Sequence, residues 1–142
     1  MKRALAATAV VLLVGMLAYA APTPSNTPSF PKTLINAQYV YVTSYDGDQF
    51  DPRLLSEDRE AISAVQEAVQ KWGRYVVVYR PDQADIVLMV QSRPSEDLLA
   101  VYDARLWPEQ TYLWRVMGRN GLQQGETPLM SELQTAVEQA SK

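Results

Sequence analysis

Residues 71–91 read KWGRYVVVYRPDQADIVLMVQ, and this stretch decides the predicted fold. Residues 75–79 and 85–91 form two nearly continuous apolar runs, which is typical of strands covered on both faces. Gly73 precedes the first run, where a helix commonly ends because glycine adopts the left-handed conformation without a Cβ clash. The stretch therefore predicts the end of a helix, a strand, a turn and a second strand.

Upstream of this stretch, the sequence predicts one strand and one helix. Residues 38–45 are rich in β-branched and aromatic residues and favour a strand, with Val40 and Val42 on one face. Tyr39, Tyr41 and Thr43 then belong to the other face. Residues 56–73 have helical spacing of apolar residues, and the expected buried stripe is Ala61, Ile62, Val65, Ala68, Val69 and Trp72.

Downstream, residues 92–97 read as a loop, and two further strands are expected at residues 98–106 and 111–118. The short sequence WPEQ between them indicates a hairpin. Residues 129–142 favour a closing helix whose buried stripe is Leu129, Met130, Leu133, Ala136, Val137 and Ala140.

The predicted order is thus strand, helix, four strands and helix, which defines an α+β fold with an α/β-like start. The first strand–helix–strand unit is expected to be a right-handed crossover between parallel strands. The later strands are expected to add antiparallel, giving a mixed sheet of four to five strands with two helices packed on it. Part of the sheet surface would stay bare, covered partly by Trp107, Trp114 and the tyrosines.

The N-terminal region predicts export. Residues 1–20 have a basic start, an uncharged apolar run over residues 4–17 and the small-residue motif Ala18-Tyr19-Ala20, which together are typical of a cleaved signal peptide. Cleavage after residue 20 would leave 122 of the 142 residues, enough for one domain. No Cys follows the apolar run, so a lipid anchor is not expected, and membrane contact is predicted only through the uncleaved signal peptide.

Composition separates a linker from a single domain. Residues 21–33 are rich in Pro, Ser and Thr and predict an extended linker, which leaves residues 34–142 as one α/β domain. We therefore expect an exported protein that is periplasmic or secreted.

Residue content excludes several classes of chemistry. The chain has no His and no Cys, which removes the usual general base, the common catalytic triads and the soft ligands of zinc and iron–sulfur sites. It has neither a phosphate-binding glycine loop nor a nucleophile elbow. Its net charge of −3, which would become −5 in the cleaved chain, disfavours nucleic-acid binding. No cofactor, metal site or catalytic residue is predicted.

One acidic segment, SYDGDQFDPRLLSED at residues 44–58, partly matches the spacing of a calcium loop. Asp46, Asp48 and Glu57 occupy its first, third and twelfth positions, as in an EF-hand. The fifth position is Phe50 and the sixth, which requires glycine, is Asp51, so we favour structural roles for these acids.

Those structural roles follow from turn and capping chemistry. Asp51 followed by Pro52 can start a helical turn, and Ser56 is expected to cap the main helix. The acids after Ser56 then lie beside the positive end of the helix dipole.

Two sets of side chains are candidates for a binding site. Trp107, Tyr112 and Trp114 resemble an aromatic platform and form the expected contact surface, although sheet packing is the simpler interpretation. Asp85 and Asp103, both at predicted strand ends, are candidate carboxylates for a carbohydrate-active or ligand-binding protein, with turn and edge roles as the alternative.

The motif W-G-R-Y, an apolar strand and P-D-Q-A-D-I-V-L together resemble small exported bacterial proteins, often acidobacterial, and the N-terminal domain of TolB with the related CsgG-type envelope domains. Leu99, Val101 and Asp103, and then Leu113-Trp114-Arg115, lie at matching places. The resemblance covers residues 37–139 and implies an envelope α/β domain that binds other proteins. The chain departs from TolB because no β-propeller follows the domain.

The sequence therefore predicts a non-enzymatic exported domain that acts through contacts with an envelope or extracellular protein. A sheet edge and the aromatic hairpin are the expected surfaces, since an exposed strand can accept another strand. The alternative is a secreted carbohydrate- or small-ligand-binding protein, hydrolytic or not, that uses the hairpin aromatics with Asp85 and Asp103. The partner and the oligomeric state stay open.

Overall fold

A computed structural model describes residues 32–109, 111–123, 125 and 127–142. The predicted signal peptide and all of the predicted linker except its last two residues lie outside the described residues. The elements follow one another as α1 (Lys32–Asn36), β1 (Tyr39–Ser44), α2 (Ser56–Trp72), β2 (Val76–Val78), the 3-10 turn η1 (Pro81–Gln83), β3 (Ile86–Ser92), β4 (Asp97–Asp103), β5 (Trp114–Gly118) and α3 (Pro128–Ala140).

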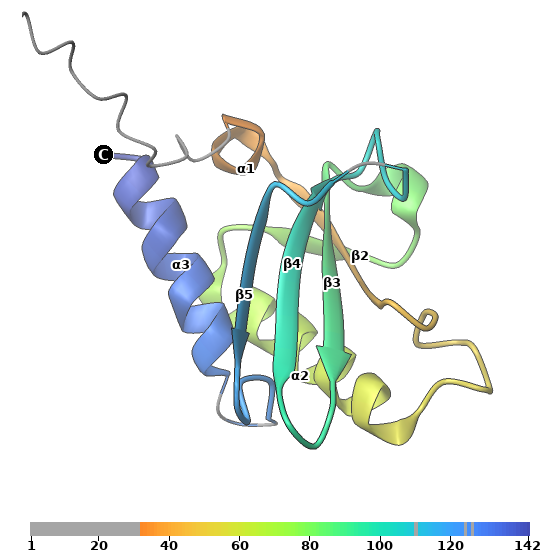
Figure 1. Ribbon diagram of the computed structural model, residues 1–142. Helices are drawn as coiled ribbons and strands as arrows, with labels where there is room; N and C mark the ends of the chain where they lie inside the picture. Colours follow the sequence, from red (N-terminus) through yellow and green to blue (C-terminus); the bar gives the residue numbers. More distant parts are fainter. Residues whose placement is uncertain (1–31, 110, 124, 126) are drawn as a thin grey trace, which may run out of the picture.

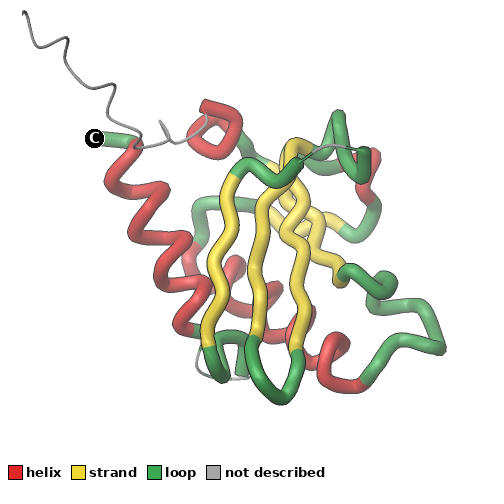
Figure 2. Tube along the Cα trace, viewed as in Figure 1, coloured by secondary structure: helices red, strands yellow, loops and turns green. Residues whose placement is uncertain are grey.

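The strands form one five-stranded mixed sheet in the order β2-β1-β3-β4-β5 (Figures 1 and 2). β1 is parallel to both β2 and β3, while β3, β4 and β5 form an antiparallel meander. The two long helices pack on this sheet, so the predicted α+β class and the predicted order of elements are confirmed.

The direction of β3 differs from the prediction. It was expected to add antiparallel, but it runs parallel to β1, with Val40 opposite Ile86 and Ser44 opposite Val90. The connection from β2 to β3 spans only residues 79–85, whereas a parallel crossover usually needs a dozen residues or more. The short connection suffices here because β2 has only three residues, so the chain travels a short distance back to the starting end of β1. The amide of Asp85 then donates to the carbonyl of Tyr39 at 2.9 Å and directs β3 into its place beside β1.

The burial of β2 also differs from the prediction. The apolar run at residues 75–79 was expected to form a strand covered on both faces, but β2 lies at the sheet edge and Val76 is 58% exposed. The central strands are β1 and β3, and Val77 alone of the three β2 residues packs against the core beneath the helices.

Both long helices cover the same face of the sheet. One buried cluster joins α2, α3 and the residues of β1, β3 and β4 that point toward them, and α1 contributes the fully buried Leu34. The members with no exposed surface include Val40, Ile62, Val65, Ile86, Leu88, Leu99, Met130 and Leu133. Val40 and Val42 face this cluster and Tyr41 faces away from it, as the alternation of residues predicted.

The ends of α2 show one correct and one wrong prediction. Gly73 ends the helix with a φ of 77°, and its amide donates to the carbonyl of Val69 at 3.1 Å, as expected. Ser56 is not the cap but the first helical residue, and no side chain bonds the helix start from the capping position at Leu55. Arg59 instead donates to the backbone carbonyls of Gln49 and Asp51 and holds the preceding loop.

The short helix α1 was not expected from the sequence. It is tied down by two side chains that follow α2. The hydroxyl of Tyr75 donates to the carbonyl of Leu34 at 2.6 Å, and Arg74 donates to the carbonyl of Ile35 at 3.2 Å. Arg74 also donates to the hydroxyl of Ser141 at 3.3 Å, so the start of the described chain is joined to its C-terminal end.

The opposite face of the sheet is covered by no helix of the described residues, and we call it the open face. Figure 1 looks onto this face, with β3, β4 and β5 in front and α2 behind them. A small cluster of Tyr41, Val87, Met89 and Ala100 is buried there beneath Trp107, Tyr102 and neighbouring side chains. The open face is therefore closed by strand residues and the β4–β5 connection rather than by a helix.

The helix-side core predicts a large effect of one truncation. Leu88 is fully buried in β3, so Leu88→Ala should lower the free energy of unfolding by about 2–5 kcal/mol. Leu55→Ala is the matched control because Leu55 is 51% exposed, and it should change the value by less than about 0.5 kcal/mol. Urea denaturation followed by circular dichroism measures both. Equal losses in the two variants would contradict the described core.

Candidate functional site

A buried carboxylate holds together the end of the sheet nearest the start of α2. Asp58 has no exposed surface, and its Oδ1 accepts from the amide of Ser92 at 2.9 Å. Arg93 donates from Nη1 to both carboxylate oxygens, at 3.0 and 3.1 Å, and from Nη2 to Asp46. The hydrogen bond to Asp58 raises the pKa of Arg93 above its ordinary value. This ion pair joins α2, β3 and the loop after β1.

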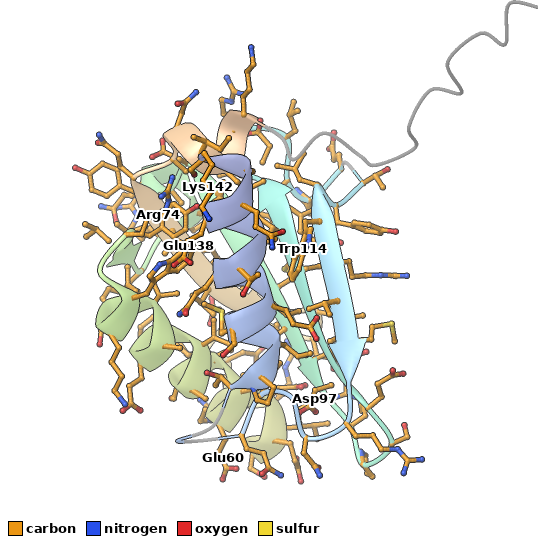
Figure 3. The ribbon with its side chains drawn as sticks, turned by 90° about the vertical axis from the view of Figure 1, so that its left-hand side faces the viewer. Glu60, Arg74, Asp97, Trp114, Glu138 and Lys142 are labelled. Carbon is orange, nitrogen blue, oxygen red and sulfur yellow. The ribbon has the colours of Figure 1, made fainter. Side chains whose placement is uncertain are left out.

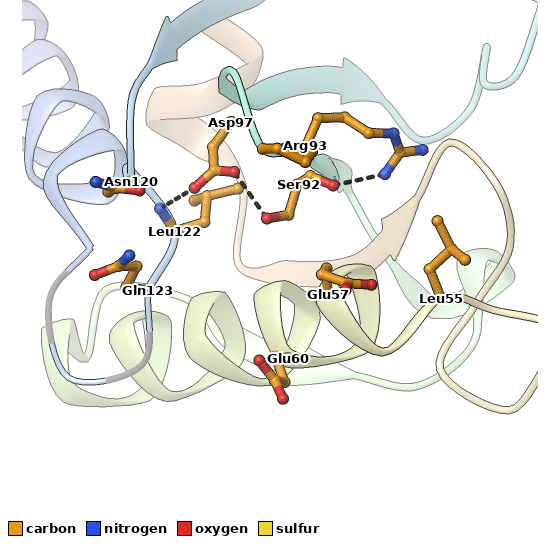
Figure 4. A pocket seen from close by; sticks show the side chains of 10 residues that line it. Leu55, Glu57, Glu60, Ser92, Arg93, Asp97, Asn120, Leu122 and Gln123 are labelled. Atoms are coloured by element: carbon orange, nitrogen blue, oxygen red, sulfur yellow. Dashed lines mark hydrogen bonds between the residues drawn. The ribbon is translucent and has the colours of Figure 1, made fainter.

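A second buried acid extends the same set of contacts. Asp97 accepts from the hydroxyl of Ser92 at 2.8 Å and from the amide of Leu122 at 3.0 Å, so β3 and β4 are joined to the β5–α3 connection (Figure 4). Next to these residues lies a cavity of about 640 Å³. Its lining consists of Leu55, Glu57, Glu60, Ser92, Arg93, Pro94, Asp97, Asn120, Leu122 and Gln123.

The acids of this cavity have structural partners or lie in solvent. Both oxygens of Asp97 accept hydrogen bonds, and Glu57 and Glu60 are exposed on the first turns of α2. Such a cavity presents the side-chain amides of Asn120 and Gln123 and the carboxylates of Glu57 and Glu60 to a polar molecule.

The three acids that match the spacing of a calcium loop are not gathered at one place among the described residues. Asp46 pairs with Arg93, Asp48 accepts from the amide of Phe50 at 2.8 Å, and Glu57 lies in the first turn of α2. Across the described parts of the chain, no three His, Cys, Asp or Glu side chains gather where they could hold a metal ion. The structure thus gives two of these three acids a turn or ion-pair role.

The buried ion pair predicts a strong dependence of stability on Asp58. Asp58→Ala leaves the Ser92 amide and the Arg93 guanidinium without their acceptor, so we expect a loss of about 3–5 kcal/mol in the free energy of unfolding. Glu57→Ala is the control, since Glu57 is exposed on the same helix turn, and it should cost less than about 1 kcal/mol. Chemical denaturation at pH 7 compares them, and similar losses would refute the role of Asp58.

The candidate carboxylates Asp85 and Asp103 lie near each other, but both accept hydrogen bonds from other groups of the protein. Asp103 pairs with Ile86 across β3 and β4, so it is close to Asp85 in the fold. Oδ2 of Asp85 accepts from the amides of Gln38 and Tyr39, at 2.9 and 3.0 Å. Asp103 accepts from the guanidinium of Arg105 through both oxygens, at 3.1 and 2.7 Å. Each acid therefore orders a strand end, as in the turn interpretation.

The pairing of Asp103 with Arg105 predicts a pH-dependent contribution to stability. The hydrogen bonds from Arg105 hold the pKa of Asp103 below its ordinary value, although burial opposes the shift. A lowered folded-state pKa stabilises the protein above the unfolded-state pKa, and this stabilisation is lost as the pH falls through the folded-state pKa. Arg105→Gln should thus destabilise at pH 7 and match the parent protein once Asp103 is protonated. Thermal melting at pH 7 and at successively lower pH, down to the acid limit of folding, tests this, and a difference that stays the same across the whole range would contradict it.

The predicted aromatic contact surface is divided between the two faces of the sheet. Trp114 packs against the helix-side core next to α3, as Figure 3 shows, with Ser131 and Thr135 nearby. Trp107 packs on the open face, where its ring meets Tyr41 edge-on at 6.3 Å between centroids. Tyr112 is 39% exposed and lies under the guanidinium of Arg115 at 4.8 Å. The structure therefore does not bring Trp107 and Trp114 together.

Trp107 belongs instead to a depression of about 400 Å³ on the open face, which we call the aromatic hollow. Its lining residues are Tyr41, Thr43, Ser44, Tyr45, Gly47, Asp48, Met89, Tyr102, Trp107 and Pro108. They come from β1 and its following turn, from β3 and β4, and from the β4–β5 connection. The hollow therefore gathers aromatic side chains from segments that are far apart in the sequence.

Most polar groups of the aromatic hollow are bonded within the protein. The hydroxyls of Thr43 and Ser44 donate to the carbonyl of Gly47, and those of Tyr45 and Tyr102 share a hydrogen bond of 3.0 Å. Burial and this tyrosine pair raise the pKa of Tyr45 far above its ordinary value. Burial also raises the pKa of Tyr41, and the negative charge of Asp48 adds to the shift. Both phenols are neutral at pH 7.

Sequence reasoning missed Tyr45 and Tyr102 as members of a site. A usable signal was present, because Tyr39, Tyr41 and Tyr45 are odd-numbered residues of one strand region and alternate away from Val40 and Val42. What the sequence lacked was the strand order that places β4 and the β4–β5 connection beside them.

No protein-family model, curated protein or solved structure matches this chain. Among the helices of the described residues, none has the length and apolar character needed to cross a membrane.

Proposed function

We propose that the chain is a non-enzymatic exported domain that binds another protein of the envelope or extracellular space through the open face of its sheet. The observation that carries this proposal is the difference between the two faces. α2 and α3 cover one face, while the other carries large apolar side chains in solvent. Exposed apolar side chains on one face support an interaction surface there, since large apolar patches mark interaction sites in soluble proteins.

The register of the strands supports the assignment of these side chains to one face. Tyr39 is 43% exposed and pairs with Val76 on β2, while Met117 is 45% exposed and pairs with Leu98, a member of the open-face cluster. Tyr45, 41% exposed, contacts Tyr102 of the same cluster. A partner covering this face would bury apolar side chains from at least four strands or strand ends.

The export part of this proposal rests on the signal-peptide pattern of residues 1–20, and the envelope setting is supported by the resemblance to TolB and CsgG-type domains. The absence of His and Cys supports binding over catalysis. The alternative, a carbohydrate-active protein using Asp85 and Asp103, has less support because structural donors engage both carboxylates.

Site-specific photo-crosslinking tests the binding face. A benzophenone amino acid placed at Met117, on the open face, should capture a partner in the envelope fraction of the native host. The same group at Glu138, exposed on α3, should not. Capture should decline in a Tyr39→Asp variant of the Met117 probe that keeps its melting temperature. Equal capture from both positions, or none from Met117, would overturn the proposed face.

A further inference from the structure

The aromatic hollow has the charge and ring arrangement of a site for an organic cation. Of the residues that line it, one is acidic, Asp48, and none is basic. Asp48 is half-buried, and its Oδ1 accepts from the amide of Phe50 at 2.8 Å. Among the hydrogen bonds of the described residues, Oδ2 accepts none, which leaves a carboxylate oxygen for a ligand.

The aromatic walls present ring faces and edges at an angle. Tyr41 and Trp107 meet at 67° with centroids 6.3 Å apart. The two rings are in edge-to-face contact, so a cation would lie beside the pair, over an exposed ring face and within about 6 Å of its centroid, the range in which ring quadrupoles attract positive charge. The same open face already contains this interaction, because the Arg115 guanidinium lies 4.8 Å from the ring centroid of Tyr112.

A neutral sugar fits the hollow less well. Sugar recognition needs several free donors and acceptors beside an aromatic face. Here the hydroxyls of Thr43, Ser44, Tyr45 and Tyr102 already take part in hydrogen bonds within the protein. The remaining polar feature is negative charge, and the whole chain is acidic, with a net charge of −3. Charge complementarity therefore favours a cation.

We propose that the aromatic hollow receives a lysine or arginine side chain presented by the partner protein. The alkyl stem of such a residue would lie along Met89 and the rings, and its cationic end would meet Asp48. This inference rests on the proposed function, since it identifies which chemistry of the partner the open face recognises.

A lysine peptide and its uncharged analogue test the inference. The probes are acetyl-Ala-Lys-Ala-amide and the same peptide with norleucine, which keeps the alkyl stem and lacks the ammonium. Titration is followed by the indole N–H signal of Trp107 in a ¹H–¹⁵N spectrum, assigned with Trp107→Phe, while Trp72 and Trp114 serve as internal references. The lysine peptide should saturate with a dissociation constant on the order of millimolar. The norleucine peptide should bind at least about tenfold more weakly.

Three variants that remove a charged side chain test the direction in which lysine-peptide binding should change. Asp48→Asn keeps an acceptor for the Phe50 amide but removes the charge, and should weaken lysine-peptide binding about fivefold. Arg115→Gln removes a neighbouring positive charge and should strengthen binding about twofold. Glu132→Gln, on α3 across the sheet, should leave binding unchanged. Melting temperatures check that each variant folds.

Three results would overturn the inference. They are equal binding of the norleucine peptide, unchanged binding in Asp48→Asn, and saturation by tetramethylammonium without binding of the lysine peptide. The last would assign the hollow to a free quaternary ammonium ligand. If the lysine peptide fails while Met117 still crosslinks a partner, the cation site is refuted and the open face remains a protein contact. If both fail, both proposals are refuted.

Discussion

Both long helices pack on one face of a five-stranded sheet, and this one-sided covering constrains the rest of the molecule. Strand residues alternate between faces, so burying Val40 and Val42 under the helices sends Tyr41 and Thr43 to the other side. That side has no second layer among the described residues, and Trp107 from the β4–β5 connection is packed over it instead. The exposed apolar side chains and the aromatic hollow are both results of this partial cover.

Polar contacts add to the apolar packing at the end of the sheet nearest the start of α2. Asp58 and Asp97 are buried acids, and between them they bind the amides of Ser92 and Leu122 and the guanidinium of Arg93. These contacts add polar links to the loop after β1, the β3–β4 turn and the β5–α3 connection, of which the first and the last also contribute Leu54 and Leu122 to the helix-side core. A buried charge with full hydrogen bonding specifies one arrangement, because any other leaves it unpaired in a low-dielectric interior.

The sequence was sufficient to predict the helices and strands but insufficient to predict which strands lie next to one another in the sheet. Apolar periodicity placed α2, α3 and the strands, and Gly73 marked the end of α2, because these signals are local. The direction of β3 and the edge position of β2 depend on a short crossover that has no sequence signature of its own. The predicted grouping of Trp107 with Trp114 also differs from the structure, and here the cause is the length of the β4–β5 connection. The connection after β4 spans residues 104–113, so the two rings do not follow the alternation of one hairpin.

The central position of β1 has a consequence for the order of assembly. β1 is the first strand to be synthesised, yet its neighbours begin at Val76 and Ile86, after the whole of α2. A chain leaving the ribosome therefore has β1 without a partner strand until α2 has emerged and β2 follows it. The meander of β3, β4 and β5 needs only residues that are near one another in the sequence, so each strand can pair as it emerges, since short loops close at low entropic cost. The sheet is thus completed by two kinds of pairing: that of β1 waits for a long helix, and that of the meander follows strand by strand.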